Sequence, residues 1–132
     1  MLALADLCQY IRSQTDVGEG ISAGILDDRL QHCIGVFDNN RSPDFRIPIG
    51  GKENARYYKL SVSVLIHWGT TQREAVQKAQ EVFELFYGVT NIKIKDSSVA
   101  FFATSAPQWL GFTEDKICEY VVSIDIYVNK EE

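Results

Sequence analysis

Two stretches of the chain alternate strictly between apolar and polar residues. From Tyr57 to Trp68 the even-numbered side chains are apolar or aromatic, and odd-numbered ones such as Ser61 and Ser63 are polar. Residues 117–129 repeat this alternation. Because a period of two places alternate side chains on opposite faces, both stretches are predicted to be strands with one buried face. The other face is expected to be polar or to contact a partner.

The segment between these strands has helical spacing. Thr71 and Glu74 form a capping-box pattern at its start, and Gly88 is a natural stop at its end. Apolar residues recur between them at intervals of three and four. The pattern predicts a helix over residues 71–87 that packs on a sheet through Val76, Ala79, Val82, Phe83 and Phe86.

Weaker patterns complete one domain over residues 1–132. The segment 38–56 holds two of the three prolines and Gly50-Gly51, so at most a short edge strand near residues 45–49 is expected there. The sequence therefore predicts an α+β fold: a single mixed β-sheet with two helices, the main helix packed on one sheet face. The other predicted elements are a helix over residues 3–14 and strands over residues 29–37 and 98–104.

Composition and charge argue against several classes of protein. The net charge is −5 and no two of the 13 basic residues are adjacent, whereas nucleic-acid-binding proteins usually carry a basic patch. Asp6 interrupts the first apolar stretch, and no apolar run is long enough to span a membrane. The three cysteines have no close spacing and are expected to be reduced and buried.

Two glycine motifs resemble ligand-binding motifs but lack the necessary context. Gly18-x-Gly20-x-x-Ala23 follows a predicted helix and precedes a strand-like segment, the reverse of the order in a dinucleotide-binding turn. Gly50-Gly51-Lys52 lacks the first glycine and the Ser or Thr of a phosphate loop. Neither motif is expected to bind a cofactor.

The titratable residues do not form a recognisable site. His32 and His67 lie in predicted strands, and Cys33, the one neighbour at a ligand spacing, faces away from His32. No sequence signal pairs a cysteine with a histidine as a nucleophile. Asp27 and Asp28 point apart in an extended segment, so they cannot share a proton. The sequence thus predicts no catalytic residue, no cofactor and no metal, and a protein that is not an enzyme.

Exposed apolar residues are better candidates for function. Trp109, with Leu110 and Phe112, is predicted to lie in a loop, where it forms either a buried lid or an oligomer contact. The long segment 38–56 is the second candidate surface, expected to be mobile until a neighbour orders it. The possible partner-binding residues are Arg41, Phe45, Arg46 and Trp109.

Three segments, taken in order, carry a family resemblance. The most specific has a proline, a Leu-Gly pair and an acidic turn before a Glu-Tyr-Val strand. The segments are Tyr57–Ile66, Glu74–Gly88 and Pro107–Val122. From about residue 45 to the end, the chain resembles the tail-terminator (minor capsid) proteins of long-tailed phages and prophages.

The resemblance implies a structural protein of the virion, assembled in the host cytoplasm. Such proteins form a ring, commonly a hexamer, on the head-proximal end of the tail. Its implied partners are other copies of the chain, the tail tube protein and the head-tail connector protein. DNA would pass through without specific binding, and no membrane is involved. A ring built head to tail needs two different complementary patches on each subunit.

Other readings remain open at this stage. Another head-tail adaptor, such as a head-closure or tail-completion factor, would have the same composition and fold class. A small α+β ligand-binding module or enzyme would instead need a pocket with converging polar groups.

Overall fold

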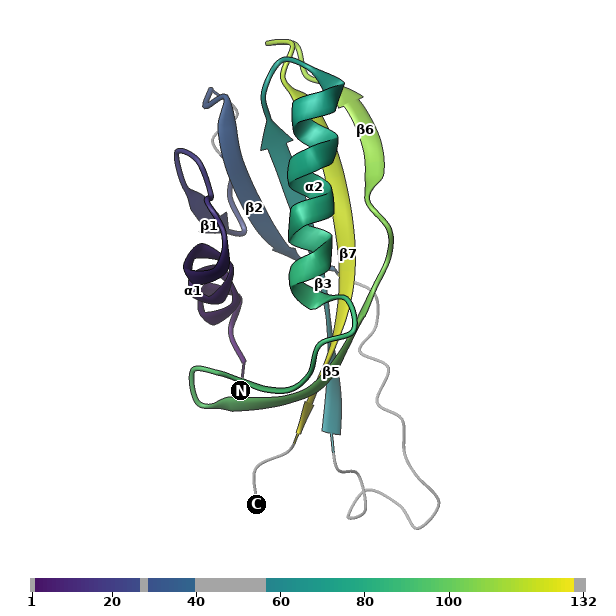
Figure 1. Ribbon diagram of the computed structural model, residues 1–132. Helices are drawn as coiled ribbons and strands as arrows, with labels where there is room; N and C mark the ends of the chain where they lie inside the picture. Colours follow the sequence, from purple (N-terminus) through teal and green to yellow (C-terminus); the bar gives the residue numbers. More distant parts are fainter. Residues whose placement is uncertain (1, 27–28, 40–56, 130–132) are drawn as a thin grey trace.

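The computed structural model describes residues 2–26, 29–39 and 57–129. Within them, two helices lie on one face of a seven-stranded sheet (Figure 1). This arrangement confirms the predicted α+β fold with a single mixed sheet. The elements are α1 (Leu4–Gln14), β1 (Ile21–Ala23), β2 (His32–Asp38), β3 (Tyr57–Trp68), α2 (Gln72–Phe86), β4 (Thr90–Ile94), β5 (Ser97–Thr104), β6 (Gln108–Phe112) and β7 (Cys118–Asn129).

The two predicted long strands form the centre of the sheet. β3 and β7 pair antiparallel along nearly their whole lengths, from Tyr57 opposite Asn129 to His67 opposite Glu119. Their buried residues face the helices, and include Val62, Val64, Ile66, Val122, Ile124 and Ile126. The alternation in the sequence therefore identified the buried face correctly.

The remaining strands extend the sheet on both sides of this pair. The order is β1-β2-β3-β7-β5-β4, and β6 also pairs with β7, beside the part that β5 leaves free. Among the paired strands that the structure describes, only β1 and β2 are parallel to one another. The β4–β5 hairpin curls below the helices (Figure 1), where Lys95 forms a 3.3 Å salt bridge with Asp6 at the start of α1.

The helix α2 begins and ends where the sequence predicts. Thr71 caps it by accepting a 3.3 Å hydrogen bond from the N–H of Glu74, and Gly88 follows with φ of +74°. The buried side facing the sheet is, however, shifted from the prediction. Val76 is exposed and Phe83 only half-buried, because both lie about 100° around the helix from the buried stripe. That stripe consists of Ala75, Ala79, Val82 and Phe86.

Lys78 also lies on the buried side of α2 and connects it to α1. Its ammonium group donates to the hydroxyl of Thr15 at the end of α1, at 2.9 Å, and to Glu81, at 2.8 Å. It also lies 4.8 Å from the ring centroid of Trp68 on β3. A buried cation needs such partners; the contact with Glu81 lies within α2, and those with Thr15 and Trp68 tie α2 to α1 and to the sheet.

The shifted packing of α2 predicts different stability losses for two phenylalanines. Phe86→Ala should lower the free energy of unfolding by about 3–5 kcal/mol, because Phe86 is fully buried against Phe102 and Tyr10. Phe83→Ala removes the same group from a half-buried position and should cost clearly less. Urea unfolding followed by circular dichroism measures both. Equal losses would contradict this placement of the helix.

The glycine-rich segment after α1 is a tight turn. Gly18 has φ of +67°, and a Cβ there would lie 2.6 Å from the carbonyl oxygen of His32. This close approach lets the chain turn back and lay β1 against β2, where the sequence indicated only a strand-like segment. Strand β4 was not predicted, because its alternation rests on two apolar residues, Ile92 and Ile94, and is too short to be recognised in the sequence.

The turn can be tested with a matched pair of variants. Gly18→Ala should destabilise the protein by about 1–2 kcal/mol from its left-handed φ alone, with the clash against His32 adding to this. Gly88→Ala is the control for the clash, because Gly88 has a similar left-handed φ of +74° but a Cβ there meets no atom within 4 Å. Thermal unfolding should separate the two, and a Gly18→Ala variant as stable as wild type would refute this account.

Candidate functional site

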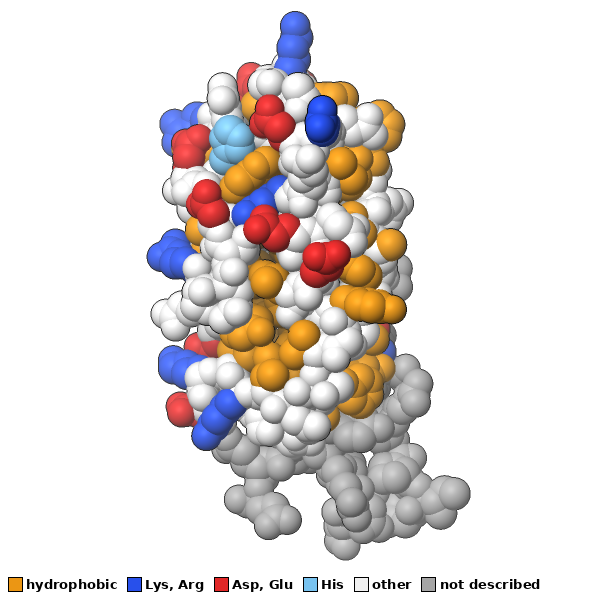
Figure 2. Space-filling view, viewed as in Figure 1, with side chains coloured by type: hydrophobic (Ala, Val, Ile, Leu, Met, Phe, Trp, Pro, Cys, Tyr) orange, Lys and Arg blue, Asp and Glu red, His pale blue; other side chains and the backbone are white. Residues whose placement is uncertain are grey.

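Strand β6 carries a cluster of large exposed apolar side chains. Trp109, Leu110 and Phe112 are 50%, 52% and 51% exposed. Figure 2 shows hydrophobic side chains along the edge of the molecule where Figure 1 places β6. The sequence placed these residues in a loop, but they form a strand paired with β7. Because they are exposed, the interpretation as a buried lid is wrong.

The pairing of β6 explains why these rings are exposed. Trp109 lies opposite Tyr120 and Phe112 opposite Cys118, so both rings stand on the face of the sheet that carries the helices. They contact one another edge to face, with centroids 6.2 Å apart. The register shifts between Trp109 and Gly111, and α2 lies over β3 and β7 rather than over β6 (Figure 1). The rings of Trp109 and Phe112 therefore lie beyond the part of the sheet that α2 covers, and they remain exposed.

β6 also has a free backbone edge. Among the described strands it pairs with β7 alone, so its other edge offers unpaired N–H and C=O groups. Natural proteins usually protect such an edge, and an unprotected one with exposed apolar side chains indicates a binding surface. The turn after β6 adds two exposed acidic residues, Glu114 and Asp115.

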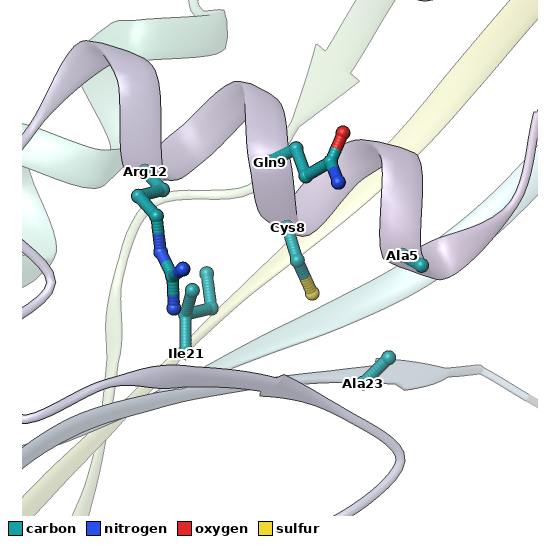
Figure 3. Close-up of a pocket in the computed structure, with 6 residues that line it drawn as sticks. All are labelled: Ala5, Cys8, Gln9, Arg12, Ile21 and Ala23. Atoms are coloured by element: carbon teal, nitrogen blue, oxygen red, sulfur yellow. The ribbon is translucent and has the colours of Figure 1, made fainter.

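A shallow pocket of about 190 Å³ lies at the opposite edge of the sheet, between α1 and β1. In Figure 3, Cys8 and Arg12 point from α1 toward β1. No carboxylate in the described part of the chain lies within salt-bridge distance of Arg12. Burial raises the pKa of the Cys8 thiol, which therefore stays protonated at neutral pH. The lining residues are Ala5, Cys8, Gln9, Arg12, Ile21 and Ala23.

Several residues singled out in the sequence lie outside the described residues. These are Arg41, Phe45 and Arg46, with the expected edge strand near residues 45–49. The same holds for Asp27, Asp28 and the Gly50-Gly51-Lys52 motif. Of the four candidate partner-binding residues, Trp109 alone is among the described residues, and it lies on an exposed edge strand.

Cys33, His67 and Glu119 come together in a way the sequence did not signal. They lie side by side on β2, β3 and β7, on the face away from the helices. Nδ1 of His67 lies 2.9 Å from a carboxylate oxygen of Glu119, which accepts the hydrogen bond. Nε2 has no hydrogen-bond partner in the described structure. Cys33 and His67 are both buried, so neither side chain is open to a substrate in this structure.

The cysteines and the other potential metal ligands are spread over the described part of the fold. All three cysteines are free and buried, as predicted. Within residues 2–26, 29–39 and 57–129, no three His, Cys, Asp or Glu side chains gather closely enough to hold a metal ion. Neither helix in that part of the chain has the length and apolar character needed to cross a membrane.

A comparison with protein families decides between the remaining classes. The family model described as bacteriophage tail terminator protein matches residues 2–130. The chain belongs to this family. The match includes the N-terminal helix and also residues 15–44, which contribute little to the resemblance seen in the sequence. In the comparison with curated proteins, none matches.

Membership of the tail terminator family gives the chain a structural role in a phage tail. The most specific segment of the original resemblance, Pro107–Val122, now has a structural meaning. It comprises the exposed strand β6, the acidic turn and the start of β7. The segment that best marks the family thus coincides with the most exposed apolar edge.

The buried Cys33–His67–Glu119 row gives a test of a purely structural role. Cys33→Ala should leave tail assembly unchanged, because Cys33 is buried and its replacement by another small residue does not alter the exposed surface. His67→Ala should lower the free energy of unfolding by about 1–3 kcal/mol, since it removes the partner of Glu119, yet the folded protein should still function. A phage complementation assay, read beside a melting curve, measures both. Loss of assembly in a stably folded Cys33→Ala variant would reopen the question of catalysis.

Proposed function

We propose that the chain caps the head-proximal end of the tail tube as a homo-oligomeric ring, commonly a hexamer in such proteins, and joins the tail to the head. The family match over residues 2–130 carries this proposal. The protein acts through its surfaces, as a structural component without catalytic activity. Its partners are further copies of itself, the tail tube protein and the head-tail connector protein.

Two features of the described surface support a ring. A subunit that joins others head to tail needs two different patches on its surface. The exposed apolar strand β6 and the pocket beside β1 are two such patches, and they lie at opposite edges of one sheet. A symmetric pairing would need only one self-complementary patch.

The charge of the protein suits a channel for DNA. With a net charge of −5, the ring would repel phosphate groups rather than hold them. DNA would therefore pass through its opening without specific binding.

A purified tail tube protein from the same phage allows a direct test. Tubes assembled with increasing amounts of the chain should become shorter, and electron microscopy should show one ring-shaped density at one end. Loss of the gene should give over-long tails. Tubes of unchanged length, together with tails of normal length that fail to attach to heads, would instead identify a head-closure factor.

A further inference from the structure

We infer that the free edge of β6 in one subunit pairs with the free edge of β1 in the next, with Trp109 seated in the pocket between α1 and β1. This inference rests on the proposed function in one respect: it names the contact from which the ring is built. The occupant of the apolar β6 edge is therefore a second copy of the chain. Four observations on the described residues lead to this choice.

The first is that the two edges lie at the same level of the sheet. One transverse row of paired residues crosses it from Ile21 through Ile34, Ile66 and Tyr120 to Trp109. A rotation about an axis along the strands therefore brings the two edges together without a shift along that axis. A head-to-tail contact without a shift along the rotation axis can close into a ring. A contact with such a shift gives a helical filament instead.

The second observation is the direction of the strands. β1 is parallel to β2, and each step from β2 through β3 and β7 to β6 is antiparallel, so β6 runs opposite to β1. A rotation about an axis along the strands leaves the direction of each strand unchanged. It would therefore pair β6 of one subunit with β1 of the next in an antiparallel manner. On β1, Gly20 and Gly24 bond to β2, so in the alternating ladder the backbone groups of Ile21 and Ala23 face the free edge.

The third observation is the match between the Trp109 side chain and the pocket. Trp109 and Ile21 both project from the helix-bearing face, so pairing of the two edges directs the indole toward the space between α1 and β1 (Figure 3). The pocket holds about 190 Å³. An apolar cavity of about 150 Å³ accepts a benzene ring, so this pocket has room for much of an indole. Arg12 at its rim can lie over the ring face.

The fourth observation is charge. Arg12 lies on the β1 side, and Glu114 and Asp115 follow β6 directly in an exposed turn. Pairing β6 with β1 brings the acidic turn, which also holds Lys116, toward Arg12 and toward the turn of Asp16 and Glu19 that precedes β1. Pairing two β6 edges with each other would leave Arg12 far from both acidic turns. The β6–β1 contact thus offers the acidic turn a cationic partner, Arg12, that a symmetric β6–β6 contact does not offer.

The test uses one variant for each half of the contact. Trp109→Glu disables the β6 side, with Trp109→Ala as a milder form should the charge disturb folding. Ala23→Trp combined with Arg12→Glu fills the pocket and reverses the charge at its rim. Tyr87→Glu is the matched control, because Tyr87 is an exposed aromatic residue at the far end of α2, away from both edges.

Sedimentation velocity at high micromolar concentration should show rings for wild type and for Tyr87→Glu. Each edge variant alone should be a folded monomer, with association weakened at least about thirtyfold, as expected for loss of a central tryptophan. An equimolar mixture of the two edge variants should form heterodimers and nothing larger, because one intact β6 edge still meets one intact pocket. That result is specific to a head-to-tail contact.

Three outcomes would overturn the inference: a wild-type chain that stays monomeric, edge variants that assemble like wild type, or a mixture without heterodimers. The tube-length assay separates this inference from the proposed function. Edge variants that form rings and still shorten tubes would refute the β6–β1 contact and leave the capping role intact. Monomeric edge variants that still shorten tubes would show the reverse, a real contact that capping does not need.

Discussion

The antiparallel pairing of β3 with β7 is the contact on which the rest of the structure depends. These two strands are the longest of the described sheet. Their buried side chains form the apolar surface on which α2 packs through Ala79, Val82 and Phe86. β2 extends the pair on one side, and β5 and β6 extend it on the other. Because β5 and β6 occupy successive parts of the same edge of β7, the sheet ends in β6 at one level and in β4 at the other.

A sheet built outward from a central pair ends in edges, and in this protein the edges carry the candidate function. The helices cover the middle of one face (Figure 1), so the side chains of β6 extend beyond them while β1 leaves a pocket beside α1. Among the described residues, the titratable pair of Cys33 and His67 lies buried and closed off from solvent. We propose that the protein acts through these edges, and the structural role of its family in a phage tail is consistent with that arrangement.

Much of the fold could be predicted because its main elements have clear periodicity. The alternation of β3 and β7 and the cap of α2 gave nearly correct bounds. Which side of α2 faces the sheet was harder to predict. Val76 and Phe83 lie at one margin of the apolar stripe of α2, and only packing against the sheet decides which margin of the stripe is buried. The site was harder still, because the pocket joins α1 to β1, a strand of three residues created by the close approach of Gly18 to His32. Trp109 was identified as a candidate, but its position on an edge strand depends on pairing with distant β7.

Amide hydrogen exchange tests the central claim, that the chain works as a ring joined through the edges of its sheet. Exchange would be compared between dilute subunits and rings bound to tube ends. The account predicts that the outward-facing amides, those of Ile21 and Ala23 on β1 and those of β6 that do not bond to β7, exchange freely in dilute subunits and become protected together in the ring. Protection that appears only elsewhere, while both edges continue to exchange freely, would contradict it.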